Sequence, residues 1–266
     1  MMLAEGGIDA AGRRVNAAFG LHVFAAGQPR GRFVTRPGTM LAASDTLDVT
    51  VRGAGGHGSA PARAKDPVIP MVEMVTTLRT MVTRQFDVFD PVVLSVGSLH
   101  AGTARNVIPD IAEFTATVRT FSAAARERMA HAVPRLLKGI AVAHGVEVDV
   151  VYTAQYPPTV NDADQTAFAA EVTTEVFDGS RHVELAKPFS GSEDFSRVLA
   201  EVPGSFIGLG ATPAGMAPEC APFNHSPLAQ YDDAVLPDGA ALYAELALRR
   251  LTSDLTTNLT PNGASA

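Results

Sequence analysis

The sequence predicts an α/β protein in which a ferredoxin-like module is inserted between two pieces of a second α/β domain. Two observations carry this prediction. Stretches of alternating polarity and stretches of helical spacing follow one another in the order strand, helix, strand, strand, helix, strand. Beyond Tyr156 the chain returns to the short apolar strands and separate helices of its start. We therefore expect the module at 44–155 and the outer domain at 1–43 and 156–251.

The first strand and the first helix of the module are marked by their spacing. Leu47, Val49 and Val51 alternate with polar residues, which is the period of a half-buried strand. Asp66 as N-cap and Pro67 as first helical residue predict the start of a helix. The expected apolar face of this helix consists of Val68, Met71, Val75, Leu78 and Val82.

The rest of the module is predicted in the same way. Two strands are expected at 92–100 and 111–120. Ser122 is placed to cap a second helix and Gly145 to end it, and Pro134 should kink it. The expected apolar face of that helix is Met129, Val133, Leu136 and Ile140, and the last strand alternates at Val146, Val148 and Val150.

The outer domain has fewer elements than a complete sheet requires. Residues 2–7 are typical of the last turn of a helix that ends at a glycine, and so few residues cannot nucleate a helix. We therefore expect that further residues precede Met1. The other expected elements are strands at 17–24 and 205–209, helices at 163–177 and 237–251, a short helix starting near Ser192, and a disordered tail at 252–266.

Composition excludes several classes of protein. Of the 266 residues 46% are hydrophobic and 18% charged, so the chain can bury a core and is not a disordered protein. The net charge of −7 and the lack of a basic patch argue against nucleic acid as a partner. We recognise no leader and no membrane span, and the single cysteine, Cys220, which we expect to be a buried thiol, excludes a disulfide framework. We therefore expect a cytoplasmic protein.

Four of the seven histidines lie in glycine- or proline-rich loops or at the end of an apolar strand, where sites usually form, and three of them are candidate site residues. On the residues alone, His22 in its apolar strand is more often satisfied by a backbone carbonyl than bound to a metal. His57 lies among glycines that leave its ring accessible, although a plain surface turn has the same composition. His225 lies in a loop five residues after Cys220, and a Cys–His pair is a weak metal signal because zinc needs three or four ligands.

Polar residues near these histidines allow two interpretations each. Asn106, in the loop between the two middle strands of the module, could donate a hydrogen bond to a carbonyl or carboxylate, or serve the turn alone. Arg119 could clamp a carboxylate with two hydrogen bonds or be a solvated edge charge. Glu193 and Asp194 open a short helix, where the helix dipole alone favours acids. Ser192 has no base partner in the sequence, so a serine nucleophile is not predicted.

Seven segments, taken in order, carry a resemblance. They are GLHVF at 20–24, TVRGAGGHGSAP at 50–61, GTARNVIPD at 102–110, TVRTF at 117–121, YPPTVND at 156–162, GSEDFS at 191–196 and NHSP at 224–227. Together they resemble the hippurate hydrolase and indole-acetyl-amino-acid amidohydrolase group of the aminoacylase and carboxypeptidase G metallopeptidases, peptidase family M-twenty. The resemblance implies part of a zinc-peptidase-like α/β catalytic domain, with the module as its lid and dimerisation domain.

The resemblance also implies a reaction and roles for single residues. The family's enzymes are metal-dependent amidohydrolases, and we expect N-acyl amino acids, hippurate-like compounds first, as substrates. His22 and His225 match residues that each bind one of two divalent ions, Zn or Mn. His57 matches the residue that reaches the partner subunit's active site in a homodimer and polarises the scissile carbonyl. Asn106 matches a residue of the lid that helps to hold the substrate.

The chain departs from the family pattern in one respect. A Cys-Gly-His-Asp segment that supplies further metal ligands, and a Glu-Glu pair that supplies a ligand and the general base, have no counterpart here. Glu5 corresponds to the helix that follows that pair. Because two histidines cannot hold a catalytic dinuclear site, we expect an N-terminally truncated and inactive member. A non-catalytic dimerisation fragment and a ligand-binding protein without chemistry are the alternatives.

Overall fold

The computed structural model describes the backbone of residues 3–259 and the side chains of residues 3–252. The chain divides into two compact units. The outer unit consists of residues 1–40, 160–188 and 198–266, and the module consists of residues 41–159 and 189–197. The second part of the module, which we call the docked segment, is therefore a short piece of chain flanked on both sides by the outer unit.

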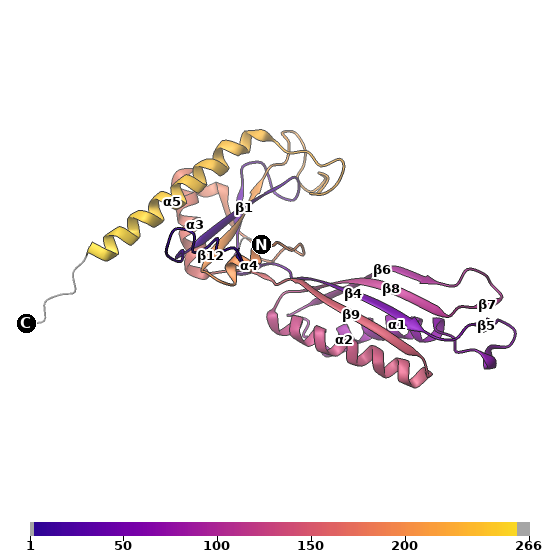
Figure 1. The fold of residues 1–266 in the computed structure, drawn as a ribbon. Helices are drawn as coiled ribbons and strands as arrows, with labels where there is room; N and C mark the ends of the chain where they lie inside the picture. The colour runs from indigo at the N-terminus through magenta and orange to yellow at the C-terminus, as the bar shows by residue number, and fades with distance from the viewer. Residues whose placement is uncertain (1–2, 260–266) are drawn as a thin grey trace, which may run out of the picture. The chain divides into compact units, whose positions relative to one another are not determined.

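The module is a four-stranded antiparallel sheet with two helices packed on one face (Figure 1). Its strands lie in the order β6-β8-β4-β9, and the element order along the chain is the predicted one. The elements are β4 (Ser44–Arg52), α1 (Val68–Gln85), β6 (Val92–Ala101), β8 (Ile111–Thr120), α2 (Ala123–His144) and β9 (Glu147–Tyr156).

The first strand and helix of the module differ little from prediction. The alternation along β4 places Leu47, Val49 and Val51 in the core, as predicted. Helix α1 begins at Val68, one residue later than expected, and the Asp66 carboxylate accepts a hydrogen bond of 2.8 Å from the Val68 N–H.

The buried face of α1 is rotated from the predicted one, whereas that of α2 agrees with prediction at Met129, Val133 and Ile140. In α1 the buried residues include Met74 and Met81, whereas Val75 and Val82 are only partly buried. Each position along a helix turns by about 100°, so the sheet side falls one residue earlier than expected. In α2 Leu137 is buried in place of Leu136.

Helix α2 has the predicted ends. The Ser122 side chain accepts a hydrogen bond from the Ala125 N–H, and Gly145 ends the helix in the left-handed conformation at φ 66°. The helix continues through Pro134 without interruption. Beside this sheet, β5 (Gly56–His57) pairs with β7 (Val107–Ile108) in a separate two-stranded ribbon.

The outer unit contains a mixed sheet in the order β1-β12-β2-β11. Strand β1 runs parallel to β12, β2 is antiparallel to β12, and β11 is parallel to β2. Side chains of α3 and α5 complete its hydrophobic core. The elements are β1 (Ala18–Phe24), β2 (Phe33–Thr35), β3 (Gly38–Leu41), β10 (Thr159–Asn161), α3 (Ala163–Val176), β11 (His182–Glu184), α4 (Ser196–Leu199), β12 (Gly204–Gly210) and α5 (Leu236–Leu259), with β3 paired to β10.

Several predictions for local structure are wrong. Residues 3–11 form consecutive turns rather than the end of a helix, and Met2 lies outside the described residues. Helix α5 continues to Leu259 because no proline or glycine interrupts it there, so the tail is not disordered at 252–259; residues 260–266 lie outside the described part. The short helix starts at Ser196 rather than near Ser192.

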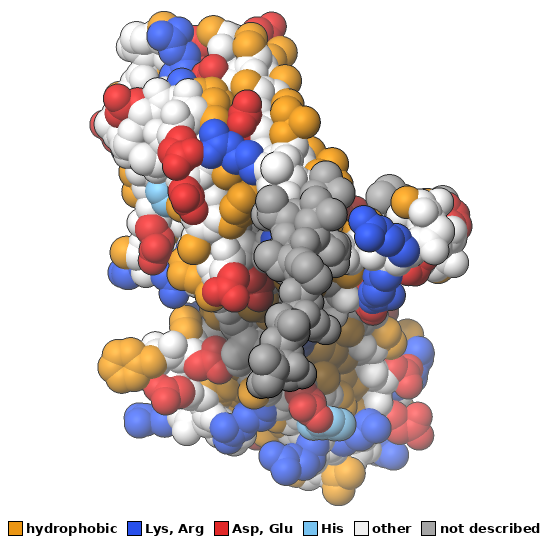
Figure 2. All heavy atoms as spheres, turned by 90° about the vertical axis from the view of Figure 1, so that its left-hand side faces the viewer, with side chains coloured by type: hydrophobic (Ala, Val, Ile, Leu, Met, Phe, Trp, Pro, Cys, Tyr) orange, Lys and Arg blue, Asp and Glu red, His pale blue; other side chains and the backbone are white. Residues whose placement is uncertain are grey.

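The exposure of Cys220, the distribution of charge and the apolar character of the helices complete the description. Cys220 is exposed, contrary to the expected buried thiol, because it lies in an irregular loop rather than in a packed element. Acidic and basic side chains are mixed over the face that Figure 2 displays. None of the described helices combines the length and the apolar character needed to cross a membrane.

Candidate functional site

His22 lies in β1, half-buried between two aromatic rings. Its ring centroid is 5.4 Å from that of Phe24 and 6.3 Å from that of Phe206. Its Nδ1 lies 2.7 Å from the carbonyl oxygen of Val23. Because a carbonyl oxygen only accepts, Nδ1 carries the hydrogen, and in the neutral ring Nε2 keeps its lone pair. This is the arrangement in which a histidine binds a metal ion through Nε2.

The loop that carries His225 is fixed to the end of β1 by its neighbour Asn224. The Asn224 Nδ2 donates to the Val23 carbonyl at 2.8 Å, and its Oδ1 accepts from the Ala25 N–H at 2.8 Å. His22 and Asn224 therefore share one acceptor. His225 itself is exposed and has φ 71°, a left-handed conformation that is uncommon outside glycine. The structure thus brings His22 and the loop of His225 to the same end of the sheet.

His57 and Asn106 are brought together in the module by the β5–β7 ribbon. His57 is paired with Val107, and the Gly58 N–H donates to the Asn106 carbonyl at 2.8 Å. A side chain at Gly58 would place its Cβ 3.1 Å from that oxygen, which explains the glycine there. The His57 Nδ1 accepts from the Ser59 N–H at 3.2 Å and lies 2.8 Å from the Ser59 hydroxyl.

The ring of His57 therefore has the opposite proton arrangement to that of His22. Because an amide N–H only donates, Nδ1 of His57 is the acceptor and the hydrogen of the neutral ring lies on Nε2. The residue is exposed, so this Nε2–H is accessible to a ligand. Such a donor suits an oxygen that gains negative charge during a reaction.

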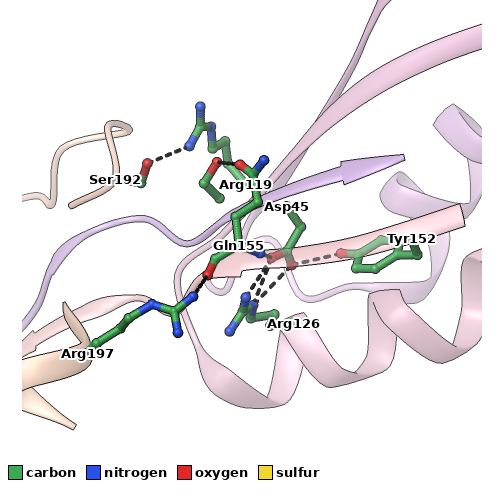
Figure 3. Close-up of polar contacts among 8 residues, drawn as sticks. Asp45, Arg119, Arg126, Tyr152, Gln155, Ser192 and Arg197 are labelled. Atoms are coloured by element: carbon green, nitrogen blue, oxygen red, sulfur yellow. Dashed lines mark hydrogen bonds and ion pairs between the residues drawn. The ribbon is translucent and has the colours of Figure 1, made fainter. Parts of the chain in front are cut away.

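Arg119 lies half-buried near the end of β8, and Figure 3 shows its side chain directed toward Ser192 of the docked segment. Its Nη1 donates to the Ser192 Oγ at 3.0 Å. Arg119 is therefore not the solvated edge charge that the sequence allowed.

A second polar cluster of the module surrounds the fully buried Asp45 at the start of β4 (Figure 3). Arg126 binds both carboxylate oxygens, with Nη2 at 2.7 Å and Nε at 3.1 Å. The Tyr152 hydroxyl donates at 3.0 Å and the Gln155 N–H at 3.1 Å. Burial, and then the charge of Asp45, raise the pKa of Tyr152 far above its ordinary value, so it remains a donor at physiological pH.

The donor set for metal ions is incomplete in the described part of the chain. Residues 3–252 contain no group of three or more His, Cys, Asp or Glu side chains that could hold a metal ion. His22, with its hydrogen on Nδ1, could bind a metal ion through Nε2. Zinc, however, takes three or four donors. His22 and His225 therefore do not make up a dinuclear centre by themselves.

The sequence of this chain matches a known protein family. The model of peptidase family M20/M25/M40 matches residues 1–249. The chain belongs to this family. Among curated M20 relatives, thermostable carboxypeptidase 1 of Saccharolobus solfataricus is 33% identical over 88% of this chain and 58% of its own length. Hippurate hydrolase of Campylobacter jejuni is 33% identical, with 88% of this chain and 59% of its own length covered.

Two solved structures are similar to this chain in fold. A Staphylococcus aureus protein assigned as an aminohydrolase gives a TM-score of 0.82 at 28% identity, covering 93% of this chain and 61% of that protein. The Bacillus subtilis YXEP protein, a dinuclear metal binding peptidase of the M20 family, gives 0.74 at 25% identity, covering 94% and 60%. The chain thus spans about three fifths of the length of each of these four proteins.

Three residues with a part in these arrangements were not predicted as site residues. Asn224 stands within the NHSP segment, and its amide, which can donate and accept at once, is the signal that could have marked it. The sequence marks Ser192 only as the start of a short helix without a base partner, and Asp45 lies where polar and apolar residues alternate along a strand. Their roles depend on partners distant in sequence.

Proposed function

We propose that this chain forms part of a metal-dependent amidohydrolase that cleaves the amide bond of N-acyl amino acids such as hippurate. The opposite tautomers of two histidines carry the proposal. His22 presents a lone pair on Nε2, as a metal ligand must, and His57 presents an Nε2–H, as a group that polarises a carbonyl must. Relatives named hippurate hydrolase and IAA-amino acid hydrolase support the substrate class.

Each candidate residue has a role in this proposal. His22 and His225 would hold two divalent ions, Zn or Mn, together with donors that the described residues do not supply. Such ions supply a water of lowered pKa when bound. His57 donates its Nε2–H to the substrate carbonyl as negative charge develops there. Asn106, fixed beside His57 by the bond from Gly58, and Arg119 hold the substrate.

The incomplete donor set leads to a second part of the proposal. We infer that the 266 residues alone do not hydrolyse amides, because two histidines are too few to hold the metal ions. Hydrolysis would then require residues outside this sequence. The proposed location is the cytoplasm.

The module is proposed to serve as lid and dimerisation domain. Strands β6 and β9 are the two edges of its sheet, and an edge strand offers unpaired backbone groups to a second chain. A homodimer would let His57 act on the substrate of the partner subunit. The same edges favour the alternative function, a dimerisation fragment without catalysis.

The experiment starts from the gene. The longest protein encoded in frame with this chain, which we call the long product, is expressed and assayed for release of glycine from benzoylglycine with Zn²⁺ or Mn²⁺. We expect hydrolysis, and a loss of more than about 100-fold in His22→Ala and in His225→Ala. His131→Ala, an exposed position on α2, is the matched control and should keep its activity.

Two results would count against the enzyme. A folded, metal-loaded long product that leaves benzoylglycine intact would contradict the proposal. A stop codon in frame immediately before the codon for Met1, together with a dimeric chain that binds no metal, would establish the alternative.

A further inference from the structure

We propose that Ser192 is a positioning residue that orients Arg119 to bind the carboxylate of the substrate. This inference rests on the proposed function, since it concerns the amino-acid end of an N-acyl amino acid. Its basis is the 3.0 Å hydrogen bond from the Arg119 Nη1 to the Ser192 Oγ (Figure 3).

Arg119 has two donors left for an anion. Within the described residues its Nε and Nη2 make no hydrogen bond, and Ser192 engages only Nη1. Nε and Nη2 lie on the same side of a guanidinium and bind a carboxylate together. Arg126 of the same module shows this arrangement, since its Nε and Nη2 bind the carboxylate of Asp45. Arg119 thus presents the donor pair that Arg126 uses, and no carboxylate of the described part of the chain fills it.

The docked segment holds the Ser192 hydroxyl in place from both sides. Before Ser192, the Ala42 N–H donates to the Phe189 carbonyl at 3.1 Å. After it, the Arg197 Nη2 donates to the Gln155 carbonyl at 2.6 Å. Both anchors lie in the module, so Ser192 and Arg119 belong to one unit. Because Ser192 occupies Nη1, rotation of the guanidinium is restricted and the donor pair keeps one direction.

The charge of Arg119 adds to this expectation. A half-buried guanidinium whose partner is a neutral hydroxyl is less well compensated than one paired with a carboxylate. An anionic ligand with two oxygens would supply the missing charge. The amino-acid carboxylate of an N-acyl amino acid has this geometry, whereas its amide does not.

The test compares Ser192→Ala with Ser190→Ala, a matched change at an exposed serine of the same segment, in the full chain. In nitrogen NMR spectra, with Arg119 assigned from Arg119→Lys, we expect separate Nη signals in the parent chain and in Ser190→Ala. We expect merged signals in Ser192→Ala. Ser192→Thr, which keeps the hydroxyl, should restore the separation. Identical Arg119 signals in the parent chain and Ser192→Ala would overturn the proposal.

Ligand titration tests the second half of the inference. Benzoylglycine should shift the Arg119 Nε–H signal, with an affinity about fivefold weaker in Ser192→Ala, and benzoylglycinamide, which lacks the carboxylate, should not. No shift with benzoylglycine, or an equal shift with both, would overturn it.

The long product separates this inference from the proposed function. We expect Ser192→Ala to raise KM for benzoylglycine about fivefold with kcat unchanged. Hydrolysis with an unchanged KM would overturn the role of Ser192 alone. If benzoylglycine shifts the Arg119 Nε–H signal and benzoylglycinamide does not, yet the long product hydrolyses nothing, only the proposed function is contradicted.

Discussion

His22 in the outer unit and His57 in the module are held by opposite hydrogen bonds. A carbonyl fixes the hydrogen of His22 on Nδ1, and an amide N–H fixes that of His57 on Nε2. The two units also differ in where their polar side chains are most firmly hydrogen-bonded. In the outer unit, bonds from Asn224 meet at the candidate site itself, whereas in the module the most buried polar cluster, around Asp45, lies at the opposite end of β4 from His57. A metal ligand needs the first arrangement, and a residue that reaches for a substrate needs the second.

The largest effect on stability should come from Asp45→Ala. Removing this buried carboxylate leaves the charge of Arg126 uncompensated, which costs about 3–5 kcal/mol of the free energy of unfolding of the module. Urea unfolding would measure it. Asp149→Ala is the control, because its ion pair with Arg52 is exposed and is worth less than about 1 kcal/mol. Equal losses in the two variants would contradict the view that the buried Asp45 cluster contributes more stability than an exposed ion pair.

Two asparagine variants compare how much the side chains next to His225 and His57 contribute to stability. Asn224→Ala removes two hydrogen bonds at the end of β1 and should cost about 1–3 kcal/mol, with faster hydrogen exchange at the Ala25 amide. Asn106→Ala should be nearly neutral, because Asn106 is exposed and joins the ribbon through its backbone carbonyl. If Asn106→Ala were the more damaging variant, the comparison would be reversed.

A smaller effect depends on pH. Burial lowers the pKa of His182, whose Nε2 lies 2.8 Å from the Thr35 hydroxyl, below 6.5 in the folded outer unit, and Glu184 partly offsets this. The neutral ring therefore stabilises the fold above about pH 6.5, and this stability is lost as the pH falls through the lowered pKa. Urea unfolding between pH 7.5 and 5 should show the loss, and His182→Gln should reduce it. A steeper loss in His182→Gln than in the parent chain would have the wrong sign.

His57→Ala should also have little effect on stability. The ring is exposed and its bonds are local to the turn, so the free energy of unfolding should change by less than about 0.5 kcal/mol. In the long product the same variant should lower kcat by about 100-fold or more, because the donor to the carbonyl is lost. A variant that is stable and fully active would remove His57 from the site.

The sequence predicts the regular parts of this fold and misses the short ones. Alternation in β4 and β8 and helical spacing in α1 and α2 each extend over enough residues to be recognised. Strands β2 and β11 have three residues each and carry no period of their own, because neighbours in space define them.

The sequence indicates candidate site residues, but not their hydrogen bonds, for a similar reason. The histidines stand out as residue types in glycine-rich or apolar segments, so the sequence alone singles out His22, His57 and His225 as candidates. The sequence does not predict the tautomers of His22 and His57, because each tautomer depends on which backbone group the ring contacts after folding. The contact of Arg119 with Ser192 joins residues 73 positions apart, and no local pattern indicates it.

The most direct test of the proposed site, shared between two subunits, is complementation between two inactive variants of the long product. His57→Ala removes the donor of the module, and His225→Ala removes the proposed ligand of the outer unit. If His57 serves the site of the partner subunit, mixed dimers contain one intact site. Subunit exchange should then restore roughly a quarter of the parent activity toward benzoylglycine. Mixed dimers that form, as seen by native mass spectrometry, yet remain inactive would contradict the account.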